Sequence, residues 1–172
     1  MGSIRYAVQP TDTSLDFEAR SSLHPVHGHA DQLTGYVDAT FNQDGSLASE
    51  PAPAMHVEFP VERLRSGNSL QDREMWKLID SKRFPLVAAD LRAVRADGAT
   101  GRYQASGDIT LAGRQRRYEG AMKVAQSGDR VSLEGELVLD ITDFGLKPPR
   151  VLMLKVEPKV TVRLKLIAER AA

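Results

Sequence analysis

The sequence predicts an all-β fold, with about eight antiparallel strands and one short α-helix in a tall barrel or sandwich around an apolar interior. The main observation is that residues 156–166 alternate between apolar and polar side chains almost without interruption. Successive side chains of a strand point to opposite faces, so this segment has one dry face and one wet face. At ~3.3 Å per residue it spans about 35–40 Å and needs long partners. A second observation is that similar alternating segments, punctuated by turn residues, make up most of the remaining chain.

The expected strands follow one another along the chain. They lie near residues 4–8, 15–19, 33–41, 55–59, 86–94, 102–111, 117–124, 131–141 and 156–166. Turn sequences at 42–45, 97–98, 112–113 and 127–129 separate several of them. The length of 172 residues suits one sizeable core and not two, so residues 1–172 are expected to form a single domain.

One segment has the pattern of a helix, from Ser69 to about Arg83. Ser69 is expected to cap its N-terminus, and Asp72 lies in the first turn, where the helix dipole favours an acidic residue. Met75, Trp76, Leu78 and Ile79 form one apolar flank, and the pair Phe84–Pro85 is expected to end the helix.

Glycine recurs inside the expected strands, at Gly35, Gly107, Gly120 and Gly135. Glycine weakens a strand, and its use there is typical of tight bends or close backbone approach at barrel corners. The alternative is that these glycines are scattered and merely tolerated.

The composition excludes several classes of function. Lys and Arg total 23 and Asp and Glu total 23, so the whole chain has no net field to attract nucleic acid or an anionic membrane. The dense basic patch of residues 114–117 is interpreted as a solvated hairpin end. Without cysteine there is no thiolate catalysis, disulfide or cysteine-ligated metal. No stretch is apolar enough to span a membrane and no export signal is visible, which indicates a cytoplasmic protein.

Four segments carry a resemblance to a known family. They are Thr13–Phe17 followed by Gly35–Val37, Leu64–Arg73 with Arg83–Pro85 after the helix, Gly107–Gly113, and Asp140–Leu146. In this order and spacing the chain resembles the YceI-like family, whose members form lipocalin-like antiparallel barrels that hold long apolar lipids. The resemblance implies a barrel of about eight strands with the helix covering one end. It also implies a polyisoprenoid, isoprenoid quinone or fatty-acyl ligand.

The ligand is expected to lie between the strands and to be enclosed by the helix. A barrel of eight strands is just wide enough to pack solid or to hold one slim guest, and the inward faces here favour small and aliphatic residues. The residues predicted to line the ligand-binding site are Phe17, Val37, Trp76, Leu91, Ile109, Met122, Leu133, Leu137, Val162 and Leu164. A solid core, which would make the protein an interaction module, is the alternative.

The histidines His24, His27 and His29 are the sharpest chemical feature, because three imidazoles within six residues are able to converge on one metal ion. A metal- or haem-handling protein is therefore the second hypothesis. Two other interpretations are rim histidines that pair with water or neighbouring carboxylates, and a polar clamp on a lipid headgroup. A regular strand would place His27 and His29 on one face and His24 on the other.

The sequence does not favour catalysis. No Gly-x-Ser-x-Gly elbow accompanies the Ser, His and Asp residues, and no phosphate-binding loop or dinucleotide fingerprint is present. Asp143, Phe144 and Gly145 are interpreted as structural, with Phe144 plugging a barrel end and Gly145 turning the chain. A non-enzymatic protein without a cofactor is expected, and the apolar residues of 148–154 suggest a homodimer.

Overall fold

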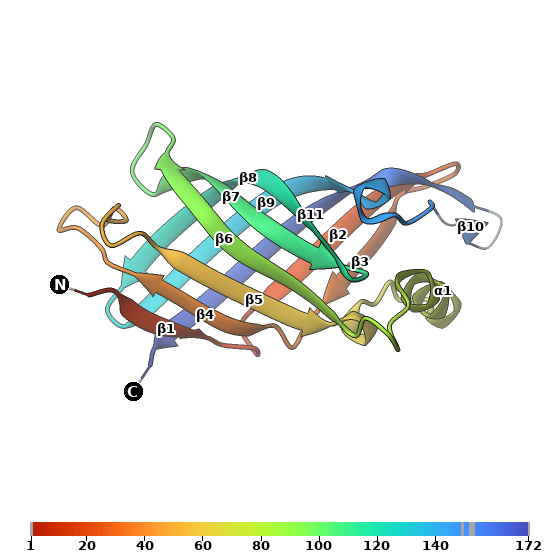
Figure 1. Ribbon diagram of the computed structural model, residues 1–172, viewed down its shortest axis with the longest axis horizontal. Helices are drawn as coiled ribbons and strands as arrows, with labels where there is room; N and C mark the ends of the chain where they lie inside the picture. The colour runs from red at the N-terminus through yellow and green to blue at the C-terminus, as the bar shows by residue number, and fades with distance from the viewer. Residues whose placement is uncertain (1, 149, 152–153, 172) are drawn as a thin grey trace.

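The computed structural model describes residues 2–148, 150–151 and 154–171, and it has the predicted all-β architecture (Figure 1). The strands are β1 (Ile4–Val8), β2 (Ser14–Ser21), β3 (Val26–Ala30), β4 (Thr34–Ala39), β5 (Ala54–Pro60), β6 (Leu86–Ala96), β7 (Arg102–Leu111), β8 (Arg114–Ser127), β9 (Arg130–Asp140), β10 (Arg150–Val151) and β11 (Leu154–Arg170). The α-helix is α1 (Ser69–Ile79), and two short 3-10 turns are η1 (Val61–Arg63) and η2 (Ile141–Phe144).

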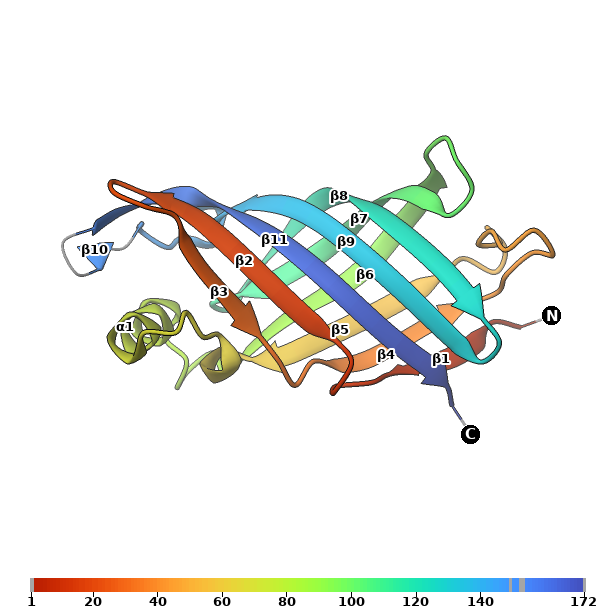
Figure 2. The same cartoon turned by 180° about the vertical axis from the view of Figure 1, so that it is seen from behind.

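Eight of these strands close into an antiparallel barrel. Their order around it is β1, β4, β5, β6, β7, β8, β9 and β11, and β11 returns to pair with β1. Because β1 pairs only with the last residues of β11, the earlier part of β11 is free to pair with β2, which in turn pairs with β3. Figure 2 shows β2 and β3 as two additional strands beside β11. The predicted long C-terminal strand is confirmed, since β11 runs for 17 residues.

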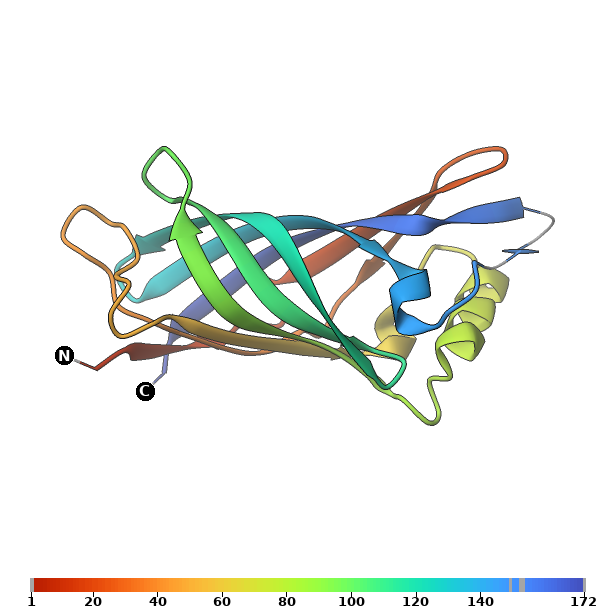
Figure 3. The same cartoon turned by 45° about the horizontal axis from the view of Figure 1, so that its top comes forward.

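The half of the barrel that holds the chain termini is packed solid. Its buried residues meet across the interior, among them Tyr6, Val37, Tyr103, Met122, Val124, Leu133 and Leu166. The loop between β4 and β5 covers this end of the barrel (Figure 3). Phe41 of that loop packs edge-on against Tyr6 at a centroid distance of 6.2 Å, and the amide of Leu47 donates to the Tyr103 hydroxyl at 2.8 Å.

The opposite end is closed by α1, η2 and the segments around them (Figure 3). Phe144 of η2 is 1% exposed and stacks on Tyr118 at 5.9 Å, and Gly145 follows with a φ of 75°. The interpretation of Phe144 as a barrel plug is thus confirmed. The Tyr118 hydroxyl donates to Asp143 Oδ2 at 2.5 Å, and burial, followed by this hydrogen bond, raises the pKa of Tyr118 to about 12.

The boundaries of α1 differ from the prediction. Asn68, and not Ser69, is the N-cap, and its side chain accepts from the amides of Leu70 and Gln71. The helix ends at Ile79 because Asp80 adopts a left-handed conformation with a φ of 63°, several residues before Phe84–Pro85. At the N-terminus the neighbouring residues Asn68 and Ser69 are both suitable caps, and at the C-terminus a left-handed residue ends the helix ahead of the proline.

Three of the four strand glycines lie where the backbones of neighbouring strands approach closely. A Cβ atom at Gly35, Gly107 or Gly120 would lie within 2.6 Å of a carbonyl oxygen on the adjacent strand, so the prediction of close approach is confirmed there. At Gly135 the nearest atoms would be 3.9 Å away, and the prediction is wrong at that position.

α1, with its 11 residues, is too short to cross a membrane, and no other helix in the described part of the chain is long and apolar enough to do so.

Candidate ligand-binding cavity

An apolar cavity of about 240 Å³ occupies the half of the barrel next to α1. Its wall comes from the inward faces of β2, β5, β6, β7, β9 and β11, with Met75, Leu78 and Ile79 of α1 at one end. Of the lining residues that the structure describes, Ser66, Gln71 and Glu157 alone carry polar side chains. The cavity is therefore almost entirely apolar, with polar groups at the end near the helix.

Five of the predicted lining residues border this cavity: Phe17, Ile109, Leu137, Val162 and Leu164. The register explains how they come together. Phe17 of β2 and Leu137 of β9 flank Val162 on β11, which places the three side chains in one rung of the wall. Ile109 faces the cavity from β7, where it pairs with Ala89, another lining residue. Their contact with a ligand stays a prediction.

Three other predicted residues, Val37, Met122 and Leu133, point inward but lie in the packed half of the barrel. They are buried against other side chains and do not reach the cavity. The period-two pattern identifies which face of a strand is inside, and it carries no information on how far along the barrel axis a residue lies.

The last two, Trp76 and Leu91, also lie outside the cavity lining. The indole nitrogen of Trp76 donates to the carbonyl of Leu64 at 3.0 Å, and the guanidinium of Arg65 lies 5.4 Å from its ring centre. The indole ring therefore connects α1 to the segment that precedes the helix. The side chain of the adjacent residue, Met75, lines the cavity. Leu91 adjoins the irregularity in the β6–β7 pairing, which interrupts the regular alternation at that point.

Most residues of the wall were not among those predicted. Leu15, Val57, Phe59 and Ala89 follow the same alternation as the predicted residues and were available to the same reasoning. The polar groups at the helix end had no such signal, because Ser66 and Gln71 come from a loop and a helix that fold onto the barrel. Ser66 is held there by Asp72, whose Oδ1 accepts from both its amide and its hydroxyl at 2.7 Å.

The histidines do not form a metal site. Pro25 and Gly28 suggested an irregular segment, but residues 26–30 form a regular strand, β3. His27 lies exposed on the outer side of this strand, with its Nε2 3.7 Å from Glu18 Oε1. His24 lies before that strand, in the hairpin, where its Nδ1 is 3.0 Å from the carbonyl oxygen of Pro25. Within residues 2–148, 150–151 and 154–171 no group of three or more His, Cys, Asp or Glu side chains is placed to hold a metal ion. The metal or haem hypothesis therefore has no support in this structure.

The segment suggested for dimerisation, residues 148–154, includes positions 149, 152 and 153, which lie outside the described residues. The homodimer stays a prediction.

A polar cluster on the outer surface of the barrel was also missed. His56 of β5 lies between two carboxylates, with Nδ1 2.7 Å from Asp90 Oδ1 and Nε2 3.0 Å from Glu58 Oε1. The ring stacks on Tyr36, which in turn lies under the guanidinium of Arg5. The hydrogen bond to Glu58, opposed by partial burial and reinforced by Asp90, raises the pKa of His56 above its usual 6.5.

This cluster predicts a pH-dependent stability. Because the pKa of His56 is raised in the folded state, its stabilising contribution is fully present below the unfolded-state pKa of 6.5 and is lost as the pH rises through the higher folded-state value. We expect the free energy of unfolding, measured by urea titration, to fall by about 0.2–1 kcal/mol across that window. His56→Asn should abolish this fall, whereas His27→Asn should keep it; an unchanged slope in His56→Asn would contradict the assignment.

The family model of the YceI-like domain matches residues 6–168, nearly the whole chain that forms the barrel. The chain belongs to the YceI-like family. The resemblance in the four sequence segments is thereby confirmed, and the closed barrel of eight strands, with two additional strands and one α-helix, is the fold of this YceI-like chain.

Solved structures with the same fold as this YceI-like protein have diverged far from it in sequence. BcnA of Burkholderia cenocepacia is 16% identical, with a TM-score of 0.78 over 94% of this chain and 99% of its own. A polyisoprenoid binding domain from Saccharophagus degradans is 15% identical, with a TM-score of 0.74 over 98% and 99%. The YCEI protein of Campylobacter jejuni is 10% identical, with a TM-score of 0.68 over 86% of each chain. No curated protein matches the chain.

Proposed function

We propose that this YceI-like protein binds a long apolar molecule, a polyisoprenoid, an isoprenoid quinone or a fatty-acyl lipid, and stores or transports it inside the barrel. The observation that carries the proposal is the apolar cavity of about 240 Å³. Membership of the YceI-like family and the similarity of the fold to a polyisoprenoid binding domain support it.

Burial alone is able to hold such a ligand. Each methylene group removed from water contributes about 0.8 kcal/mol, from which the costs of association are subtracted. A chain that fills the tube needs no polar recognition along its length. The packed half of the barrel, with Val37, Met122 and Leu133, closes the tube and limits the length of ligand that lies fully inside.

We further propose that the protein is not an enzyme. The polar lining residues Ser66, Gln71 and Glu157 lie at the helix end of the cavity, and the wall beyond them is aliphatic and aromatic. A bound chain would therefore lie against side chains that neither donate nor accept protons and that contain no nucleophile.

The test is to identify the ligand directly. Protein purified without detergent is extracted with organic solvent, and the extract is compared by mass spectrometry with that of an unrelated protein from the same host. We expect one class of long-chain isoprenoid or fatty compound in near-stoichiometric amount. An extract free of such compounds, together with a failure of the delipidated protein to take up added polyprenol, quinone or fatty acid, would overturn the proposal.

A further inference from the structure

The large apolar side chains that remain exposed are concentrated at the cavity end of the molecule. Among the described residues four such side chains stand out. Three of them, Leu23 (80% exposed), Leu70 (44%) and Leu86 (45%), belong to the β2–β3 hairpin, to α1 and to the start of β6, and these elements gather at this end (Figures 1 and 3). The fourth, Val138, lies on β9. Apolar residues exposed singly are ordinary, but three gathered at the end that holds an apolar cavity indicate a contact surface.

Each of these leucines is close in sequence to the cavity wall. Leu23 is in the β2–β3 hairpin, which connects the paired lining residues Ala19 and Val26. Leu70 precedes Gln71, and Leu86 precedes Val87, and both of these neighbours line the cavity. Three separate elements, a hairpin, a helix and a strand start, thus place one exposed leucine each at the end of the barrel that α1 and η2 close.

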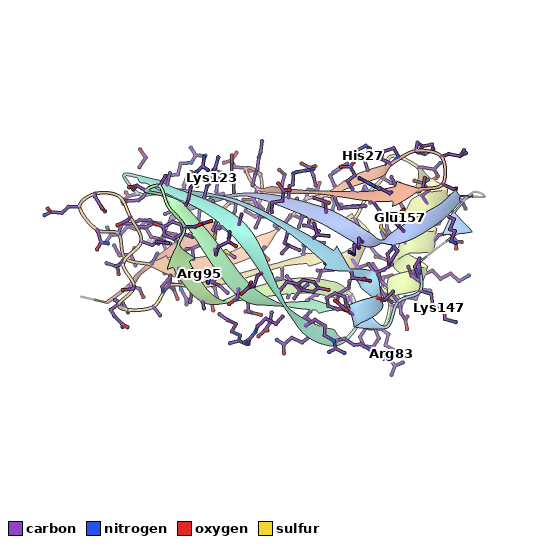
Figure 4. All side chains as sticks on the ribbon, turned by 90° about the horizontal axis from the view of Figure 1, so that it is seen from above. His27, Arg83, Arg95, Lys123, Lys147 and Glu157 are labelled. Atoms are coloured by element: carbon purple, nitrogen blue, oxygen red, sulfur yellow. The ribbon has the colours of Figure 1, made fainter. Side chains whose placement is uncertain are left out.

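The charges are segregated towards the same end. The segments gathered there, residues 20–25, 65–86, 111–117, 140–148 and 154–159, contain 12 Lys and Arg but 6 Asp and Glu, which leaves 11 and 17 for the rest of the chain. Figure 4 shows Arg83 and Lys147, together with the acidic Glu157, at this end, and Arg95 and Lys123 far from it. A chain that is neutral as a whole therefore has a net positive charge in the segments at this end and a net negative charge in the rest.

We propose that this end of the protein docks on the surface of an anionic lipid bilayer. The leucines enter the interface between headgroups and acyl chains, while the surrounding basic side chains pair with the anionic headgroups; apolar insertion and charge attraction together are what hold proteins at such surfaces. An acidic protein would also pair with the basic side chains, but such a partner would not in general bury three separated leucines. Docked in this way, α1 and the helix end of the cavity lie against the bilayer, and an apolar molecule that passes α1 enters the cavity without crossing water.

This inference goes beyond the proposed function and does not require the cargo to be known. Binding of the purified protein to phosphatidylcholine vesicles is compared, by flotation, with binding to phosphatidylcholine vesicles that contain phosphatidylserine. We expect binding to the second kind and its loss at high salt. Neutralising Lys82, Arg83 and Lys147 together as glutamines should weaken it about 100-fold, since each basic residue near the surface contributes about fivefold. Leu23→Ser should weaken it about tenfold.

The matched control removes the same charge from the opposite end, through Arg95→Gln, Arg102→Gln and Lys123→Gln. This variant should bind as the unchanged protein does, and thermal melting verifies that all variants are folded. Equal losses in the two triple variants, or no preference for phosphatidylserine in the unchanged protein, would overturn the proposal and favour an acidic protein as the partner. Ligand extraction and vesicle flotation are separate measurements, so failure of one leaves the other standing.

Discussion

Replacing Leu166 by alanine is expected to lower the free energy of unfolding by about 3–5 kcal/mol. Leu166 is 0% exposed and lies in the packed half of the barrel, directly opposite Leu133 in the register between β11 and β9. Truncating it leaves a void among side chains that close packing prevents from collapsing into the space. Urea denaturation of the delipidated protein measures the loss.

The matched control is Leu164→Ala, on the same strand and the same inward face two residues earlier. Leu164 lines the cavity, so its side chain already borders empty space and makes fewer contacts to lose. We expect its truncation to cost about 1–2 kcal/mol, mainly the transfer free energy of the removed carbons. Equal losses from the two substitutions would show that the barrel is packed to the same density throughout, and would contradict a ligand cavity.

Replacing Ala89 by phenylalanine is expected to lower ligand affinity about 100-fold or more. Ala89 lies between Val57 on β5 and Ile109 on β7, and all three residues line the cavity. A ring at this position fills space that the ligand would occupy and displaces several methylene groups, each of which contributes about 0.8 kcal/mol, or about fourfold in affinity. The measurement is the amount of ligand that co-purifies, followed by titration of the delipidated variant with the compound identified by extraction.

The control for this prediction is Ala93→Phe, because Ala93 is an exposed residue later on the same strand. It adds the same ring outside the wall and should leave the ligand content unchanged. If Ala89→Phe kept its ligand while remaining folded, the binding site would have to lie elsewhere in the molecule.

The strands and their inward faces were predictable from the sequence because alternation is a local property. Phe17, Ile109, Leu137, Val162 and Leu164 border the cavity as the alternation suggested. Local signals failed where two of them competed. Pro25 and Gly28 concealed β3, which is held in place by pairing along its whole length with β2. Asn68 and Ser69 are both good caps, and the sequence alone did not distinguish them.

The cluster around His56 shows a different limit. His56, Glu58 and Asp90 come from two strands that are distant in sequence, and their contact depends on the register of β5 with β6. Register is a property of the assembled sheet, which is set by the buried face and by the turns. No local pattern in the sequence predicts such a cluster.

By itself the sequence determined the resemblance to the YceI-like barrel and, for most of the strands, which side chains face the interior. Only the tertiary structure decided that Leu133 and Leu166 meet in a packed half, whereas Leu137 and Leu164 border an open one. Depth along the barrel axis depends on strand register and on what closes each end, and neither is encoded in the alternation of a single strand. The basic end is likewise formed by five segments that are separate in the sequence, so the neutral overall composition does not reveal it.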